Sequence, residues 1–186
     1  VYGSYLYMGN GAYLEIVEIR GTRPYLVKRG KILLPDVVND VFVDGVGGMA
    51  YVACDKAGLH VVEITNPFNP VWRGSVDTPG RALGVFVWEN YAYVADGYGG
   101  LAVVNVTFPQ NPNTVATYSL SNRYVRDVYV DLWSPSGGVQ KLVAYVAADT
   151  AGLWVLDVTQ PSTPTRIGAL RLNGSAKGVF VSRNIA

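Results

Sequence analysis

One segment of the chain occurs three times, over residues 50–70, 92–112 and 144–164. Each copy has a Tyr-Val-Ala run, a glycine turn, a second apolar run and an exit marked by two prolines. Corresponding residues lie 42 positions apart between the first two copies, and 52 apart between the second and the third. A repeat of about 40 to 45 residues with several short strands is typical of β-propeller blades.

Each repeat divides into four predicted strands. The first is rich in Val around a central Phe or Tyr, which is typical of a strand buried on both faces. The second is the Tyr-Val-Ala run, and residues 5–8 are its counterpart near the start, with Leu6 in the place of Tyr51. The fourth is more polar, as an outermost edge strand should be. The predicted first strands are residues 41–43, 85–87, 128–130 and 179–181; the third are 14–18, 59–63, 101–105 and 153–157; the fourth are 25–28, 71–75, 114–119 and 165–169.

The third strands read Leu-Glu-Ile-Val-Glu, Leu-His-Val-Val-Glu, Leu-Ala-Val-Val-Asn and Leu-Trp-Val-Leu-Asp. In these runs, and in the flanking Gly-Leu and Pro-x-x-Pro features, the sequence resembles the LVIVD repeat family, whose repeats are β-propeller blades. The resemblance covers nearly the whole chain as four copies, of which the first is degenerate. Glu18, Glu63 and Asn105 stand in the place of the family's Asp, and residues 20–24 replace the double proline. The resemblance implies an architecture and a frequent surface location, but no single chemistry.

We therefore predict an all-β fold, a single β-propeller over residues 1–186 built from about four repeats of four antiparallel strands, or a segment of a larger propeller. The repeats are approximately residues 1–40, 41–84, 85–127 and 128–178. Residues 179–186 either begin the next blade or close the first into a four-bladed ring. The first alternative is favoured because residues 184–186 begin another repeat.

The longer spacing to the last copy indicates an insertion at residues 132–141, between a first and a second strand. Its Ser-Pro-Ser-Gly-Gly core favours a loop or an extended hairpin. In the usual strand order of a blade, this insertion shares one face of the molecule with the Pro-x-x-Pro crossings. The glycine turns and the inter-blade loops lie on the opposite face.

Composition excludes several classes of function. Charged residues are 16% and hydrophobic residues 49% of the chain, which suits sheets packed on both faces. A net charge of +1 without any Lys/Arg run argues against nucleic acid or an anionic membrane as a partner. The single cysteine excludes an internal disulfide and a Cys-based metal site. No apolar stretch is long enough for a membrane helix.

Asp55, Asp96 and Asp149 lie in the predicted turns between second and third strands, where a ring of carboxylates could bind calcium or act on a substrate. Asp55 and Asp149 precede their turn glycine by three residues, but Asp96 precedes it by four. This slip favours turn residues that hydrogen-bond their own backbone. We predict no cofactor, and these three aspartates are the only candidate metal ligands.

Other reactive residue types favour structural roles. The glycine runs at residues 97–100 and 45–48 are predicted hairpin turns, because a strand and not a helix follows them. His60 is the only histidine, so a packed or surface position is expected. Cys54 aligns with Asp96 and Ala148 and is expected to be a tolerated small residue.

The loops that lead into the first strands carry a cluster of cationic and aromatic residues, namely Arg81, Arg123, Tyr124, Arg126 and Lys177. We expect them to converge around the central channel, where Arg and Tyr can stack on sugars or peptides and pair with carboxylates. The alternative is solvated loop charges paired with Asp77 and Asp127. Asn105 and Asn173 begin glycosylation sequons, and Asn173, in a Gly/Ser loop, is the more credible acceptor.

These features predict a non-enzymatic binding or structural module, extracellular or at the cell surface, that presents variable loops on a rigid ring to a protein or a carbohydrate. One alternative is a subunit of a surface assembly that self-associates through its terminal strands. Another is a propeller enzyme with an acidic or metal site at the channel mouth.

Overall fold

The computed structural model describes residues 2–121, 123–134 and 138–182. These residues form one three-stranded and three four-stranded antiparallel sheets and contain no α-helix. None of the described segments is therefore a helix long and apolar enough to cross a membrane. The strands are β1 (Tyr5–Asn10), β2 (Tyr13–Arg20), β3 (Tyr25–Leu33), β4 (Asp40–Asp44), β5 (Met49–Ala53), β6 (Leu59–Glu63), β7 (Val71–Val76), β8 (Gly84–Trp88), β9 (Tyr91–Ala95), β10 (Leu101–Asn105), β11 (Asn113–Tyr118), β12 (Asp127–Trp133), β13 (Lys141–Ala147), β14 (Leu153–Asp157) and β15 (Thr165–Leu170).

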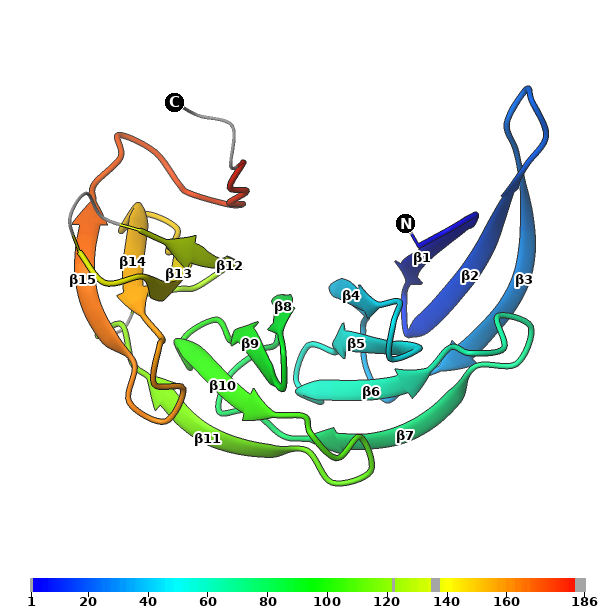
Figure 1. Ribbon diagram of the computed structural model, residues 1–186, viewed down its shortest axis with the longest axis horizontal. Helices are drawn as coiled ribbons and strands as arrows, with labels where there is room; N and C mark the ends of the chain where they lie inside the picture. Colours follow the sequence, from blue (N-terminus) through cyan, green and yellow to red (C-terminus); the bar gives the residue numbers. More distant parts are fainter. Residues whose placement is uncertain (1, 122, 135–137, 183–186) are drawn as a thin grey trace.

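Each sheet is one blade with its strands in chain order: β1–β3 form blade 1, β4–β7 blade 2, β8–β11 blade 3 and β12–β15 blade 4. The blades follow one another around an open arc (Figure 1). Strands β4, β8 and β12 lie on the concave side of the arc, and β7, β11 and β15 form its convex rim. The predicted all-β, propeller-type fold is confirmed.

Residues 179–181 do not form the predicted strand. The Val179 N–H donates to Asp127 Oδ2 over 2.8 Å, as the Val85 N–H does to Asp40 over 2.9 Å. The segment thus takes the place of an innermost strand, but no described strand lies beside it to complete a ladder. Its described part, residues 179–182, does not pair with β1, so the alternative in which it closes the first blade into a four-bladed ring is not observed in the described residues. Residues 184–186, on which the other alternative relied, lie outside the described residues.

The register of blade 1 also differs from the prediction. Tyr7 lies opposite Ile16 in the same way that Tyr51 lies opposite Val61. Tyr7, and not Leu6, is therefore the counterpart of Tyr51. Because side chains alternate along a strand, a one-residue error in register assigns every side chain to the wrong face.

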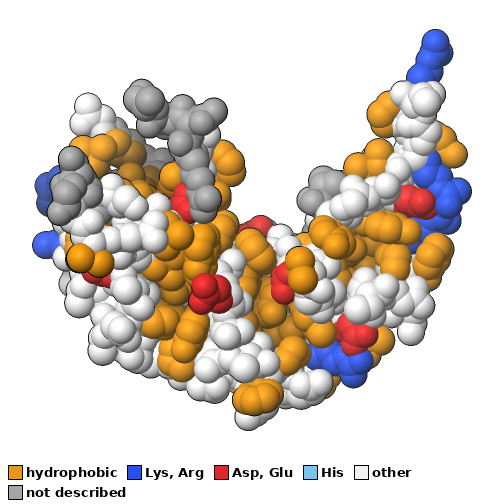
Figure 2. Space-filling model, viewed as in Figure 1, with side chains coloured by type: hydrophobic (Ala, Val, Ile, Leu, Met, Phe, Trp, Pro, Cys, Tyr) orange, Lys and Arg blue, Asp and Glu red, His pale blue; other side chains and the backbone are white. Residues whose placement is uncertain are grey.

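Neighbouring blades pack face to face through buried aliphatic and aromatic side chains. The cluster between blades 3 and 4 includes Tyr93, Leu101, Val103, Val130 and Leu156, all fully buried. Figure 2 shows hydrophobic side chains gathered in the seams between blades, with Lys and Arg toward the rim. Burial of apolar surface between blades is thus the main source of stability, as in other stacked repeats.

Outer strands also touch the next blade directly. A Cβ atom on Gly74 of β7 would lie 2.5 Å from the carbonyl oxygen of Pro109, in the crossing between β10 and β11. Gly30 of β3 is packed in the same way against Pro67 of blade 2. In blade 4 the corresponding Gly168 meets only the Val155 side chain, at 3.7 Å or more.

The insertion at residues 132–141 lengthens β12 and β13, which pair as far as Trp133 opposite Lys141. Its described part is therefore an extended hairpin, whereas residues 135–137 lie outside the described residues. The Leu142 N–H donates to Thr159 Oγ1 over 3.0 Å. This contact joins the base of the hairpin to the Pro-x-x-Pro crossing of blade 4, on the predicted face.

Candidate ligand-binding site

The loops that leave blades 2, 3 and 4 each lie against the glycine turn of the blade that they leave, through a pair of backbone hydrogen bonds. The turn residue in each pair has a positive φ, between 43° and 55°, which Gly adopts freely and Asp tolerates. In blade 3 the positive-φ residue is Gly97, so Asp96 occupies the preceding position. This explains the slip in the aspartate pattern. The pairs are Ala82 with Asp55, Val125 with Gly97, and Ala176 with Asp149.

Two of the loop arginines are neutralised by these turns. Arg81 donates from Nε to Asp55 over 2.6 Å and from Nη2 over 2.5 Å. Arg126 Nη2 lies 2.7 Å from Asp149 Oδ2. The Arg81 guanidinium holds the pKa of the Asp55 carboxyl below its ordinary value, and Ser175 with Arg126 lowers the pKa of Asp149.

The predicted hydrogen-bond partners were therefore wrong both for the turn aspartates and for the loop arginines that bind them. Asp55 and Asp149 bond the facing loops and not their own backbone, because the left-handed turn places them opposite those loops. Arg81 and Arg126 bond these turn residues and not Asp77 or Asp127.

Asp96 is fully buried and ties down the loop that leads into blade 3. Its carboxylate accepts from Thr78 Oγ1 over 2.6 Å and from the Gly80 N–H over 2.7 Å. A Cβ atom on Gly80 would collide with the Asp96 carbonyl oxygen, so the loop has no free space here. Burial raises the pKa of Asp96. Within the described ranges, no three His, Cys, Asp or Glu side chains come together as metal ligands.

Tyr124 and Lys177 lie beside these ion pairs. The Tyr124 ring meets Tyr98 edge-on at 4.8 Å, and the Arg126 guanidinium lies 5.0 Å from the Tyr124 ring centre. Lys177 contributes to lowering the pKa of Asp149. Of the five predicted patch residues, Arg123 lines a groove between the described loops and the blade 4 sheet.

This groove lies at a position where blade 4 has no counterpart of the aspartate that binds the loop in blade 3. Arg123 lies two residues before Val125, the loop residue paired with the turn, and Gly80 lies two residues before the paired Ala82 in the preceding loop. Arg123 and Gly80 are therefore at corresponding positions. Ala148 directly precedes the paired turn residue Asp149, as Asp96 directly precedes Gly97 in blade 3. Without a carboxylate to bind the loop backbone, the loop and the sheet leave a groove of about 650 Å³.

Three arginines and a tryptophan dominate the groove. The Arg166 guanidinium lies 4.9 Å from the centre of the half-buried Trp154 ring, which fixes its position by a cation–π contact. No lining residue is acidic, so the three positive charges are not neutralised from within the groove. The lining is Arg123, Thr150, Ala151, Trp154, Arg166, Ala169, Arg171, Leu172 and Asn173.

Sequence reasoning missed Trp154 and Arg166, although a signal for them exists. They occupy a diagonal pair of positions on the third and fourth strands, in which the fourth-strand residue lies opposite the residue two places after the third-strand one, and this pair differs in every blade. In blade 1 the pair forms a salt bridge of 2.9 Å, and in blade 2 a hydrogen bond of 3.2 Å. The four pairs are Glu15 with Lys28, His60 with Trp72, Ala102 with Thr114, and Trp154 with Arg166.

The remaining reactive residues have structural positions. His60 is buried and accepts from Trp72 Nε1, and burial lowers its pKa. Burial raises the pKa of the Cys54 thiol to about 12, which disfavours the nucleophilic thiolate. Asn105 Oδ1 accepts from the Thr107 N–H over 2.9 Å, whereas Asn173 is exposed at the rim of the groove.

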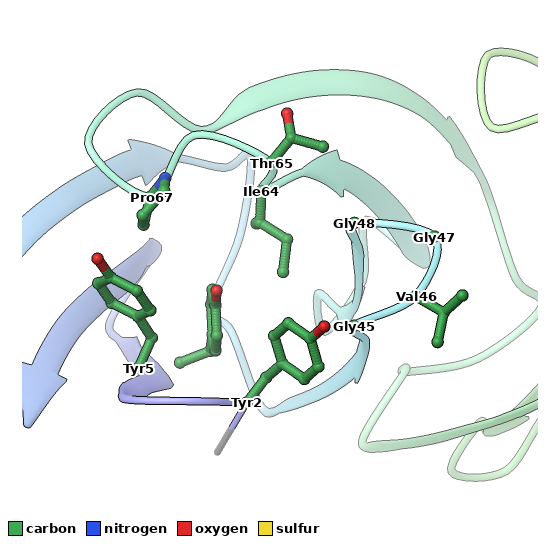
Figure 3. A pocket seen from close by; sticks show the side chains of 10 residues that line it. Tyr2, Tyr5, Gly45, Val46, Gly47, Gly48, Ile64, Thr65 and Pro67 are labelled. Carbon is green, nitrogen blue, oxygen red and sulfur yellow. The ribbon is translucent and has the colours of Figure 1, made fainter.

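A second cavity, of about 290 Å³, lies between blades 1 and 2 (Figure 3). The Tyr2 ring lies against Gly45 of the glycine turn at residues 45–48, Tyr5 lies on the other side of the cavity, and Thr65 and Pro67 complete the wall. Its lining offers hydroxyl groups and ring faces but no charged side chain.

The comparison with protein families decides the relationship suggested by the third strands. Residues 38–78, 79–119 and 143–170 match the LVIVD repeat, which is more than half of the chain. The chain belongs to the LVIVD repeat family. No curated protein matches the sequence.

Among solved structures, the crystal structure of a functionally unknown protein from Desulfotomaculum acetoxidans DSM 771 is similar to this LVIVD chain. The TM-score is 0.53 at 13% identity, over 93% of this chain and 67% of that chain. At this identity the likeness shows the fold alone.

The acidic position that ends the LVIVD strands of blades 2, 3 and 4 keeps one role despite its substitutions, whereas Glu18 of blade 1 accepts from Arg20 and Arg29. Glu63 accepts from Thr65 Oγ1, Asn105 from the Thr107 N–H and Asp157 from the Thr159 N–H. In each case the side chain fixes the start of the crossing to the outer strand. The position is structural, so variation between Asp, Glu and Asn does not indicate a changed site.

Proposed function

We propose that this LVIVD chain is a non-enzymatic binding module, extracellular or at the cell surface, that presents the groove of blade 4 to an acidic partner. One observation carries the proposal: Arg123, Arg166 and Arg171 line one groove that contains no carboxylate. The planar guanidinium matches a carboxylate or a similar anion with two parallel hydrogen bonds.

The contrast with the other loop cations supports this choice of groove. Arg81 and Arg126 already donate to Asp55 and Asp149, so an incoming anion would have to displace a formed ion pair. The groove arginines are exposed, and no ion pair within the described residues occupies them. An anionic ligand could therefore pair with these arginines without breaking an existing ion pair of the protein.

The stacked blades support a role in presentation. The turn at residues 148–152 and the loop at residues 171–176 are held together by the paired bonds of Asp149 and Ala176. Groups held in position before binding lose less conformational entropy when the ligand arrives.

The proposal is tested by measuring the binding of three polyanions, polyglutamate, polygalacturonate and dextran sulfate, by calorimetry at low and physiological salt. The variant R123A/R171A removes two groove charges, and R23A/R73A removes the same net charge elsewhere. A lost charge-assisted hydrogen bond of about 1.5–3 kcal/mol predicts at least a tenfold loss of affinity in the groove variant. Equal losses in both variants, or no binding of any polyanion, would contradict the proposal.

The extracellular or surface location rests on the sequon at Asn173, which is exposed, and on the frequent surface location in the resembling family. Expression with a secretion signal in a eukaryotic host tests the sequon. A mass decrease on deglycosylation that N173Q abolishes is expected, and an unmodified secreted chain would count against this part of the proposal.

A second candidate function is that of an assembly subunit. Leu153 and Val155 are partly exposed, whereas Leu101 and Val103 at the same positions of blade 3 are fully buried. This apolar face of blade 4 could be covered by another copy. Light scattering over a hundredfold range of concentration is the test, and a monomer throughout would exclude this candidate.

The enzyme alternative has less support. It relied on Asp55, Asp96 and Asp149, and each of these carboxylates is engaged by a loop contact.

A further inference from the structure

We propose that the ligand of the blade 4 groove is an acidic saccharide, an inference that rests on the binding function proposed above. It is carried by the position of the groove in the sheet, by the mixture of side chains that line it, and by the contact between Trp154 and Arg166.

The groove lies over the face of the blade 4 sheet where β14 pairs with the outermost strand β15. Trp154 and Ala169 form a cross-strand pair of β14 and β15, and both line the groove. The floor is therefore made of side chains, and the backbone of β14 beneath Trp154 is engaged in ladders with β13 and β15. An extended peptide gains most of its affinity by adding a strand to a free edge, because its own N–H and C=O groups need partners. This floor offers it no such partners.

A saccharide fits this surface better because its polar groups lie around the circumference of each ring. The small apolar side chains of Ala151 and Ala169, with Leu172, can contact the C–H face of a sugar. Thr150 and Asn173 supply a hydroxyl and an amide for ring hydroxyl groups. A volume of about 650 Å³ is in the range of pockets that hold small ligands.

The acidic group of the saccharide is recognised by the arginines. Arg166 is held by the Trp154 ring, so its remaining N–H donors are positioned before the ligand binds. Trp154 therefore acts as a positioning residue, and Arg166 as the residue that contacts the anion. Arg123 and Arg171 approach from the two loops and allow a second acidic group to be bound.

The test compares four probes of similar length by calorimetry: oligogalacturonate, a sulfated oligosaccharide, oligogalacturonate with its carboxyl groups reduced to alcohols, and oligoglutamate. We expect at least one acidic oligosaccharide to bind ten times more tightly than both the neutral oligosaccharide and oligoglutamate. R166A should abolish this preference, whereas R23A, with the same change in charge, should retain it.

The role of Trp154 is tested with W154A and W154F, after circular dichroism has shown that both fold. W154A should weaken acidic saccharide binding about as much as R166A does, and W154F should restore most of it, because Phe keeps an aromatic face. Equal binding by W154A and the unchanged protein would overturn the positioning role.

The two proposals fail in different ways. If oligoglutamate binds as tightly as the acidic saccharides and R123A/R171A weakens it, the saccharide is wrong and the acidic-partner function stands. If the neutral oligosaccharide binds as well as the acidic one, charge recognition is wrong. If no probe depends on the groove arginines, both proposals fail.

Discussion

At the scale of single residues, aspartates with different surroundings perform different tasks in equivalent turns. Asp96 is buried without a cation and binds a hydroxyl and a backbone N–H, whereas Asp55 and Asp149 pair with arginines. The first arrangement closes a loop onto its turn. The second leaves charged groups at the surface but neutralises them.

We predict that Asp96→Ala destabilises the fold by about 1–3 kcal/mol, because the Thr78 hydroxyl and the Gly80 N–H lose their acceptor in a buried site. Urea unfolding followed by fluorescence measures this change. Asp77→Ala, in the same loop, serves as the control and should change stability by less than about 0.5 kcal/mol. Similar stability of the two variants would show that the buried contacts contribute little.

The pH dependence of stability should respond to Arg81. The folded-state pKa of Asp55 is lowered, so its contribution is present above the unfolded pKa of about 3.9 and is lost as the pH falls below it. Arg81→Ala should therefore make the loss of stability between about pH 5 and pH 3 shallower. The test is the free energy of unfolding measured across this pH range for the unchanged protein, for Arg81→Ala and for the control R23A. If the curve of Arg81→Ala runs parallel to that of the unchanged protein, the coupling between Asp55 and Arg81 is refuted.

At the scale of elements, the outer strands β3 and β7 are each fitted to the crossing of the next blade. Gly74 and Gly168 occupy corresponding positions in β7 and β15, but only Gly74 is covered by a crossing. The same substitution should therefore have different effects at the two positions.

We expect Gly74→Ala to destabilise the protein by about 1–3 kcal/mol, since the new methyl group would overlap the Pro109 carbonyl. Gly168→Ala should change stability by less than about 1 kcal/mol, because only ordinary contact with Val155 follows. Thermal and urea unfolding of both variants provide the comparison. A larger loss at Gly168 than at Gly74 would show that the crossing does not determine this position.

At the scale of the whole molecule, blades 2 and 3 are each packed between two neighbours, and blade 4 has one exposed face. In repeat proteins, stability is approximately a sum over units and nearest-neighbour interfaces. Local stability should therefore vary along the arc.

Hydrogen exchange is expected to show this gradient. The amides of β10, whose residues 101–104 are all buried, should exchange most slowly, and those of β14 should exchange faster. Peptide-resolved exchange followed by mass spectrometry measures both strands in one sample. Equal protection would indicate that the described blades open as a single cooperative unit.

Much of this architecture could be predicted from the repeated sequence. Apart from residues 179–181, the Val-rich, Tyr-Val-Ala and LVIVD runs correspond to observed strands, because their periodicity and β-branched content are local properties. The glycine turns were also predictable, since a positive φ restricts the residue type. The candidate site was predictable only in part: Arg123 came from loop composition, and the variable pair of Trp154 and Arg166 was visible only as a disagreement between copies.

The sequence alone determined that this chain forms four similar antiparallel sheets with glycine turns and proline crossings. Only the tertiary structure decided which charges remain available to a ligand. Asp55 and Asp149 neutralise two loop arginines, and Asp96 closes one loop, through contacts between residues as many as 26 positions apart. Such pairings depend on how turns and loops meet in space, so local sequence patterns do not encode them, and the open groove of blade 4 emerges only when the blades are stacked.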